Sequence, residues 1–135
     1  MAVTGKCLCS NITYSIDNPP AMTGECHCKN CQRQAGSAFA ALAGVPVSEL
    51  HINGEPKLFL DADTSSGNSV QRFFCGDYGS PIYSLVQSSP DMVFLKTGTL
   101  GDNSTFQPQF HVWCETKQNW VDIPDGVPAM PGNPA

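Results

Sequence analysis

The sequence predicts a single, mostly β domain of short strands joined by many turns. The chain has 135 residues, enough for one domain with one hydrophobic core. Its 12 glycines and 11 prolines are spread along the sequence, as expected where turns separate short strands. No stretch shows the periodicity of a long amphipathic helix. We therefore expect short antiparallel sheets that together build one domain.

Several segments show the patterns of strands and tight turns. Residues 11–16 alternate polar and apolar side chains, as in a half-buried strand, and residues 38–47 form a run typical of a buried strand. The Asn-Gly pair at 53–54 lies between apolar runs and predicts a hairpin. A short helical turn is expected within 28–36. Further strands are predicted in 69–74 and 81–86, which flank a hairpin-like turn, and in 91–100 and 106–115.

The domain is expected to span residues 3–129. The sequence shows no interior linker and no internal repeat. The C-terminal segment, PDGVPAMPGNPA, is rich in proline and has little to bury. We therefore expect residues 130–135 to form an extended or disordered tail.

Charge and hydropathy argue against several classes of partner. The net charge is −5, and charged residues make up 14% of the chain, against about 25% in a typical soluble protein. The seven lysines and arginines form no run, so neither nucleic acid nor an anionic membrane is an expected partner. No apolar run is long enough to span a membrane, and the N-terminus lacks the apolar region of a secretory signal. A cytoplasmic location is expected.

The seven cysteines carry most of the chemical information. Five of them stand in CxC or CxxC spacing, which suits metal ligands or redox thiols better than disulfides in a chain without an export signal. The cysteines are at positions 7, 9, 26, 28, 31, 75 and 114. Cys114 stands alone in a predicted strand, where a cysteine is usually a small buried hydrophobic residue.

The segment CHCKNC brings Cys26, Cys28 and Cys31 within six residues. Soft thiolates favour zinc, and three of them leave one coordination place open, as in catalytic zinc sites. The alternative is a structural site whose fourth ligand comes from elsewhere, and the spacing alone leaves both open. A thioredoxin-like redox motif fits less well because it requires a long helix after the second cysteine. His27 is expected to point to the other face of an extended segment.

Cys7 and Cys9 form a second incomplete set. If they lie on a strand, both sulfurs point to one side, and Cys75 in the turn CGDYGS is their natural distant partner. Three thiolates would again leave a tetrahedral site incomplete. The alternative is a group of reduced, metal-free thiols.

Taken together, these motifs resemble the glutathione-dependent formaldehyde-activating enzyme family, which includes the centromere protein V type. The resemblance covers about residues 3–129. The motifs that carry it are GKCLC at 5–9, CHCKNCQRQAGSAF at 26–39, RFFCGDYGSPIY at 72–83, KTGTLGDNSTFQPQFHVW at 96–113 and WVDIPDGVP at 120–128.

The resemblance implies an Mss4-like β-tent fold whose short antiparallel sheets pack around two zinc sites. It implies a catalytic zinc held by Cys26, Cys28 and Cys31. It also implies a structural zinc held by four cysteines in family members, of which three are present here. Those three are Cys7, Cys9 and Cys75, and the fourth family position is occupied by Tyr78.

Tyr78 is the main departure from the family pattern. A phenol with a pKa near 10 is a poor ligand at neutral pH, so we expect the structural zinc site to be weakened or empty. Closure of the site by Asp77, by water or by Tyr78 itself remains open, as does a metal-free turn. A smaller departure is Ser10, where the family often has glycine.

The resemblance implies a zinc-dependent carbon–sulfur lyase that interconverts glutathione plus formaldehyde with S-hydroxymethylglutathione. The alternatives are a non-catalytic zinc-containing binding module and a lyase for a different thiol–aldehyde adduct. Lys29 and Arg33 flank CHCKNC and could attract a substrate carboxylate, although ordinary exposed cations are the more common case. His27 and His111 are candidates for the general base, and a structural role is the more common case for each.

Overall fold

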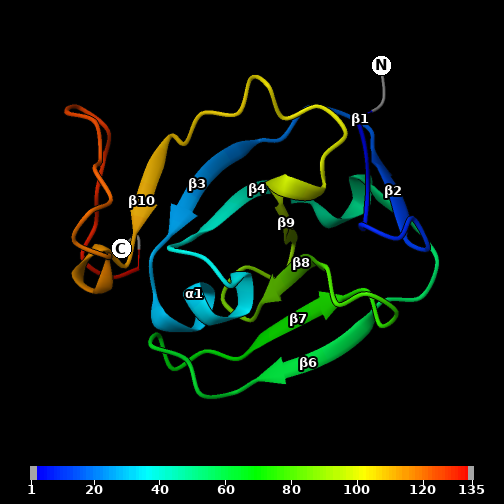
Figure 1. Ribbon diagram of the computed structural model, residues 1–135, viewed down its shortest axis with the longest axis horizontal. Coiled ribbons are helices and arrows are strands. Elements are labelled where there is room, and N and C mark those ends of the chain that lie inside the picture. Colours follow the sequence, from blue (N-terminus) through cyan, green and yellow to red (C-terminus); the bar gives the residue numbers. More distant parts are fainter. Residues whose placement is uncertain (1–2, 134–135) are drawn as a thin grey trace.

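The protein folds into two β-sheets of unequal size and one short α-helix (Figure 1). The structure is a computed structural model that describes residues 3–133. The small sheet has the order β1-β2-β5 and contains β1 (Val3–Lys6), β2 (Thr13–Ile16) and β5 (Leu50–Asn53). The predicted fold class, a mostly β fold built from short strands, is confirmed by this architecture.

The large sheet has seven strands in the order β10-β3-β4-β9-β8-β7-β6. Its strands are β3 (Met22–Cys26), β4 (Ala40–Pro46), β6 (Lys57–Asp61), β7 (Val70–Phe74), β8 (Pro81–Val86), β9 (Met92–Lys96) and β10 (Phe110–Val112). The pairs are antiparallel except that β10 runs parallel to β3, where only antiparallel pairs were expected. The helices are α1 (Lys29–Ala35) and the 3₁₀ turns η1 (Val47–Glu49), η2 (Thr97–Thr99) and η3 (Cys114–Thr116).

The main core lies between the two sheets. Because side chains alternate along a strand, β9 sends Val93 and Leu95 into this core and turns Phe94 and Lys96 to the opposite face. From the small sheet, Ile16 is fully buried in the same core. The large sheet therefore has one face devoted to packing and another that is free to line a cavity.

The predicted hairpin at Asn53-Gly54 is wrong, although the turn itself is present. Gly54 has a φ of 97°, the left-handed conformation that an Asn-Gly turn requires. However, β5 pairs with β2 in the small sheet and β6 pairs with β7 in the large sheet. The chain uses this turn to cross from one sheet to the other.

The CxC segment is a loop rather than part of a strand. Cys7 and Cys9 lie in the connection between β1 and β2, which is closed by a hydrogen bond from the Cys7 N–H to the Ile12 carbonyl (3.0 Å). Ser10, in the same connection, has a φ of 67°. Cys114 is likewise outside a strand, since β10 ends two residues earlier and Cys114 opens η3, where it is half-buried.

The C-terminal segment that is described folds back along β10. Met130 N–H donates to the His111 carbonyl (2.9 Å), and Trp113 N–H donates to the Gly132 carbonyl (3.1 Å). Residues 130–135 were expected to be extended or disordered, and residues 134–135 lie outside the described part of the chain. These hydrogen bonds place the end of the described chain next to the site considered below.

Two surface properties complete the description of the fold. Within residues 3–133, no helix has the length and hydropathy that a membrane span requires.

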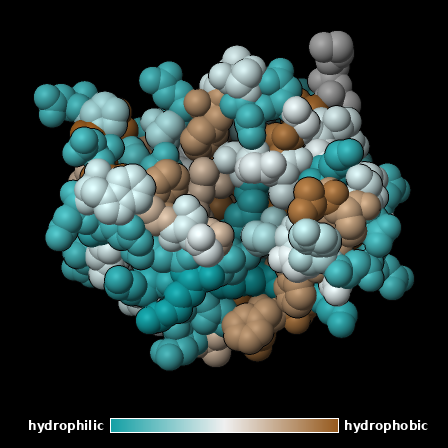
Figure 2. Space-filling view, viewed as in Figure 1, coloured by the Kyte–Doolittle hydropathy of each residue, from teal (hydrophilic) through white to brown (hydrophobic). Residues whose placement is uncertain are grey.

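Leu58, Phe59 and Leu60 are exposed on β6, the edge strand of the large sheet. Figure 2 shows hydrophobic side chains at the lower edge of the molecule, where β6 runs in Figure 1.

Candidate metal centre and its cavity

Three cysteines meet where β3 ends and α1 begins, and we call them the cavity trio: Cys26, Cys28 and Cys31. Cys26 is the last residue of β3, Cys28 is the N-cap of α1, and Cys31 lies in the first turn of that helix. All three are buried, and their sulfur atoms lie within 4.8 Å of one another. A strand-to-helix junction thus gathers three thiols from six consecutive residues.

Local hydrogen bonds explain why this segment folds as it does. Cys28 has an extended backbone, and its sulfur accepts a hydrogen bond from the Cys31 N–H (3.2 Å), which caps the helix. Gln32 donates through its side chain to the His27 carbonyl (2.8 Å). Gly36 ends the helix in the left-handed conformation, with a φ of 62°. The predicted helical turn within 28–36 is therefore confirmed.

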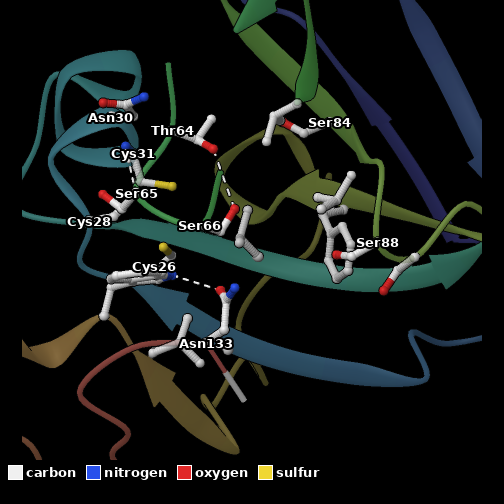
Figure 3. Close-up of a pocket in the computed structure, with 18 of the residues that line it drawn as sticks. Cys26, Cys28, Asn30, Cys31, Thr64, Ser65, Ser66, Ser84, Ser88 and Asn133 are labelled. Atoms are coloured by element: carbon white, nitrogen blue, oxygen red, sulfur yellow. Dashed lines mark hydrogen bonds between the residues drawn. The ribbon is translucent and has the colours of Figure 1, made fainter. Parts of the chain in front are cut away.

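A cavity of about 460 Å³ opens beside the cavity trio, on the face of the large sheet that points away from the main core. Figure 3 shows the three cysteines at one end, with the loop that carries Thr64, Ser65 and Ser66 beside them and Ser84 and Ser88 towards the other end. Apolar side chains from β4, β9 and β10 form part of the wall: Leu42, Phe94, Phe110 and Val112. The volume lies within the range typical of small-molecule sites.

Trp113 closes one side of this cavity next to the cavity trio. It has a left-handed φ of 58°, and its indole Nε1–H donates to the Asn133 side-chain oxygen (2.9 Å; Figure 3). The folded-back C-terminal segment therefore holds the indole ring in place. Trp120, which belongs to the family-like motif near the C-terminus, is 71% exposed and does not line the cavity.

Two buried cations, Arg72 and Lys96, line the same cavity and were not singled out from the sequence. Arg72 on β7 is 6% exposed, and Lys96 on β9 is 7% exposed. The Arg72 Nε–H donates to the Asp61 carboxylate (2.9 Å), and Asn30 on α1 donates to the same carboxylate (2.9 Å). This network connects the helix of the cavity trio to β6 and β7.

The protonation of the cavity trio favours a bound cation. Hydrogen bonds from Cys26 and Cys28 lower the pKa of the Cys31 thiol, so one thiolate forms readily. The same contacts with Cys28 and Cys31 raise the pKa of Cys26 strongly, and burial raises it further. All three sulfurs can ionise together only when a positive charge is added among them. The residues present therefore fit a thiolate-bound metal.

A second group of three cysteines, here called the hairpin trio, consists of Cys7, Cys9 and Cys75. The Cys9 sulfur lies 3.5 Å from that of Cys7 and 3.4 Å from that of Cys75. The turn after β7 is tight, because the Gly79 N–H donates to the Cys75 carbonyl (2.7 Å). The group has the spacing of a metal site, and none of its members lines the cavity.

No described Cys, His, Asp or Glu completes the hairpin trio as a fourth member within 4.8 Å. Asp77 instead accepts a hydrogen bond from the Asn11 side chain (2.7 Å). The Tyr78 side chain is 65% exposed. The closures through Asp77 or Tyr78 that the sequence left open therefore have no support in this arrangement.

The histidines do not face the cavity. His27 Nε2 lies 3.0 Å from His111 Nδ1, and both residues are buried behind the cavity trio, with the Glu25 carboxylate 3.4 Å from the same His111 nitrogen. Burial, followed by the neighbouring His111, lowers the pKa of His27 to about 4. A general-base role for either histidine is thus unsupported, since neither reaches the cavity.

Glu25, His27 and His111 also have the spacing of a metal site. A cation bound through both facing nitrogens would place protons on His27 Nδ1 and His111 Nε2. Both of these atoms are buried without a hydrogen-bond partner among the described residues. Ligating histidines normally donate from the second nitrogen, so this cluster suits a metal poorly.

Lys29 and Arg33 were expected near the site as flanking cations. Both are exposed on the outer side of α1, and both line a separate shallow depression instead of the cavity. Arg72 and Lys96 provide the positive charge inside the cavity. The available sequence signal was a cation at an alternating position within an apolar strand, as in MVFLK.

Known proteins resemble this chain in sequence. The family model described as "Glutathione-dependent formaldehyde-activating enzyme" matches residues 2–116. A protein of Podospora anserina, named "Putative glutathione-dependent formaldehyde-activating enzyme", is 27% identical over 88 residues. The matched region covers 62% of this chain and 39% of the relative, so the chain spans about two fifths of the length of that curated relative.

One solved structure resembles the chain in fold. It is a crystal structure of a Rhodobacter sphaeroides protein from the Northeast Structural Genomics programme, with a TM-score of 0.60 and 22% sequence identity. The match covers 76% of this chain and 92% of that one. At this level of identity, the likeness shows a shared fold and no more.

Proposed function

Since the chain belongs to the glutathione-dependent formaldehyde-activating enzyme family, we propose that it is a carbon–sulfur lyase for a thiol–aldehyde adduct. The expected reaction joins glutathione and formaldehyde to S-hydroxymethylglutathione, or reverses that step. One observation carries the proposal: the three buried thiols of the cavity trio border a cavity of about 460 Å³ that also contains two buried cations.

The proposed metal is zinc, held by Cys26, Cys28 and Cys31. Thiolate ligands favour zinc among the common protein metals. When bound, zinc would lower the pKa of a thiol placed in its open position and so supply a thiolate at neutral pH. The three cysteines hold the site together, and the carbonyl and side-chain hydrogen bonds around α1 fix their positions.

The cavity walls suit a small thiol with a polar body. Leu42, Val112 and Trp113 pack against the cavity trio, and apolar surroundings of this kind strengthen electrostatic interactions beside the sulfurs. Ser84 and Ser88 line the other end, and Thr64, Ser65 and Ser66 line the wall beside the sulfurs (Figure 3). These hydroxyl groups can bond to amide or carboxylate groups of a peptide-like thiol. This division supports glutathione as the thiol.

A second zinc is proposed at the hairpin trio, with lower occupancy. Its three sulfurs are close enough to share an ion, but the exposed Tyr78 offers no fourth thiolate. None of its three cysteines lines the cavity beside the cavity trio, so its proposed role is structural.

The proposal is tested by measuring thiol–formaldehyde exchange with NMR on the purified chain of 135 residues. Wild-type protein should exchange S-hydroxymethylglutathione faster than the uncatalysed mixture. Cys28→Ser should reduce exchange to the uncatalysed rate and remove one zinc per chain. Cys114→Ser is the matched control, because Cys114 belongs to neither trio, and it should retain both exchange and zinc.

Exchange by the wild type that stays at the uncatalysed rate with glutathione and other small thiols would refute the lyase proposal. That result would favour a non-catalytic zinc module. Exchange with another thiol, but not with glutathione, would keep the reaction class and change the substrate.

A further inference from the structure

Lys96 places a positively charged side chain on the wall of the cavity. It ends β9 on the cavity side, and it is 7% exposed. No hydrogen bond or ion pair joins its side chain to any residue in the described range 3–133. A buried charge without a partner is costly, so such a group normally has a ligand to satisfy it.

Arg72 provides the contrast within the same cavity. Its guanidinium is bonded to Asp61, which also accepts from Asn30, so its charge is already balanced by the protein. Lys96 has no such carboxylate. The cavity therefore contains one satisfied cation and one cation that is available to a negative or strongly accepting group.

The position of Lys96 narrows the kind of group that it can bind. Lys96 is the register partner of Leu42 on the neighbouring strand β4, Leu42 packs against the cavity trio, and Lys96 lines the same cavity as the three cysteines, which places its side chain on the part of the wall next to them. The carboxylates of glutathione are separated from its sulfur by several bonds. An acceptor near the cysteines is therefore more naturally an atom one or two bonds from the substrate sulfur.

We propose that Lys96 donates a hydrogen bond to the oxygen of the one-carbon unit that is added to, or removed from, the substrate sulfur. This inference rests on the proposed function. It makes Lys96 a catalytic residue for the carbon–sulfur bond, distinct from the metal ligands and from the residues that hold the thiol.

The chemistry places negative charge where Lys96 can stabilise it. In the forward direction, the thiol loses its proton, and a sulfur electron pair forms the bond to the formaldehyde carbon. The C=O π electrons move to oxygen, which takes up one proton and becomes the hydroxyl. One proton is lost and one is gained, so the adduct contains all the atoms of the thiol and the aldehyde. In reverse, the hydroxyl loses a proton, C=O forms, and the sulfur leaves with the bonding pair. Oxygen carries the developing charge in both directions.

The test compares Lys96→Met, which has a similar length and no charge, with Lys96→Arg, which keeps the charge. Zinc per chain and thermal unfolding are measured beside kcat and KM for exchange. Lys96→Met should retain zinc and lower kcat about 100-fold, the usual effect of losing a donor to a developing oxyanion. The change in KM should be smaller, and Lys96→Arg should recover part of kcat.

An unchanged kcat in Lys96→Met would overturn the inference. So would a fall in kcat that merely follows loss of zinc, because Lys96 would then serve only as a counter-ion for the thiolates. Thr64→Val is the matched control, since it also lines the cavity but bonds to Ser66 and to a backbone carbonyl. It should affect KM more than kcat.

A binding measurement separates this inference from the proposed function. S-(methoxymethyl)glutathione and S-propylglutathione differ only in that an oxygen two bonds from sulfur, the position of the adduct oxygen, replaces a methylene group. Wild-type protein should bind the oxygen compound about tenfold more tightly, as expected for a hydrogen bond from a charged donor, and Lys96→Met should lose the preference. Equal affinities in the wild type would refute the role of Lys96. A preference without turnover would keep that role and refute the lyase.

Discussion

The two cysteine trios have the same number of sulfurs but stand in different surroundings. The cavity trio comes from six consecutive residues and borders a cavity with two buried cations. The hairpin trio packs into the main core, and none of its three cysteines lines that cavity. An incomplete set of thiolates therefore indicates a reactive site only where space and charge are provided beside it.

The hairpin trio joins distant parts of the chain. Cys7 and Cys9 lie in the loop between β1 and β2 of the small sheet, and Cys75 follows β7 of the large sheet. A metal bound there would connect the two sheets across 66 residues of sequence. A metal in the cavity trio closes only a short loop. It therefore restricts the unfolded chain less and stabilises the fold less. We infer that one trio supports the fold and the other supports chemistry.

Cys75→Ser is expected to have the largest effect, because it should lower stability without lowering exchange and so distinguish the roles of the two trios. It should remove any zinc above one per chain and lower the free energy of unfolding by about 2 kcal/mol or more, because it places a hydroxyl in a fully buried position and breaks the connection between sheets. Exchange per folded molecule should stay within about twofold of wild type, whereas Cys28→Ser loses exchange. Guanidinium unfolding and NMR exchange measure the two effects.

A loss of exchange in folded Cys75→Ser would contradict the division of roles. It would mean that the hairpin trio controls the reactive site although none of its cysteines lines the cavity. Retained stability would equally show that the trio does not connect the sheets.

The features that depend on nearby residues were predictable from the sequence. Alternation of polar and apolar residues indicated β2, and Gly36 indicated the end of α1. The CxC and CxxC spacings pointed to two groups of cysteines because such spacings bring sulfurs together in most local conformations. The fold class followed from many short elements of this kind.

The features that depend on tertiary pairing were not predictable. The Asn53-Gly54 turn has local causes, but nothing local determines that β5 and β6 belong to different sheets. Lys96 and Arg72 occupy alternating positions in strands of the large sheet, one face of which packs into the main core. Only the folded arrangement shows that their face lines a cavity, whereas Lys29 and Arg33, next to the cysteines in sequence, point outward.

Tyr78→Cys sharpens the comparison by supplying the thiol that the hairpin trio lacks. Tyr78 is exposed in the turn that follows Cys75, so the change removes few buried contacts. A fourth thiolate should raise zinc affinity at this trio at least tenfold and bring the protein to two zinc per chain, with higher thermal stability. Competition with a chelator measures the affinity. Exchange should not change.

Zinc that remains at the wild-type level in Tyr78→Cys would show that the turn cannot direct a side chain at position 78 towards the trio. Tyr78→Ser is the matched control, because it removes the ring without adding a ligand. It should leave zinc binding at the hairpin trio unchanged.

Ser10→Gly is the smallest expected effect and tests the backbone of the hairpin trio. Ser10 has a φ of 67°, a conformation that costs a non-glycine residue about 1 kcal/mol and that glycine adopts freely. Because glycine also gains freedom in the unfolded chain, the net gain in the free energy of unfolding should be below about 1 kcal/mol. If relief of strain acts through metal binding at the hairpin trio, the stabilisation by Ser10→Gly should disappear in a Cys75→Ser background. If the strain belongs to the loop alone, the stabilisation should persist in that background. Because the φ angle belongs to the loop between β1 and β2, we expect it to persist, and a double-mutant cycle measures the difference.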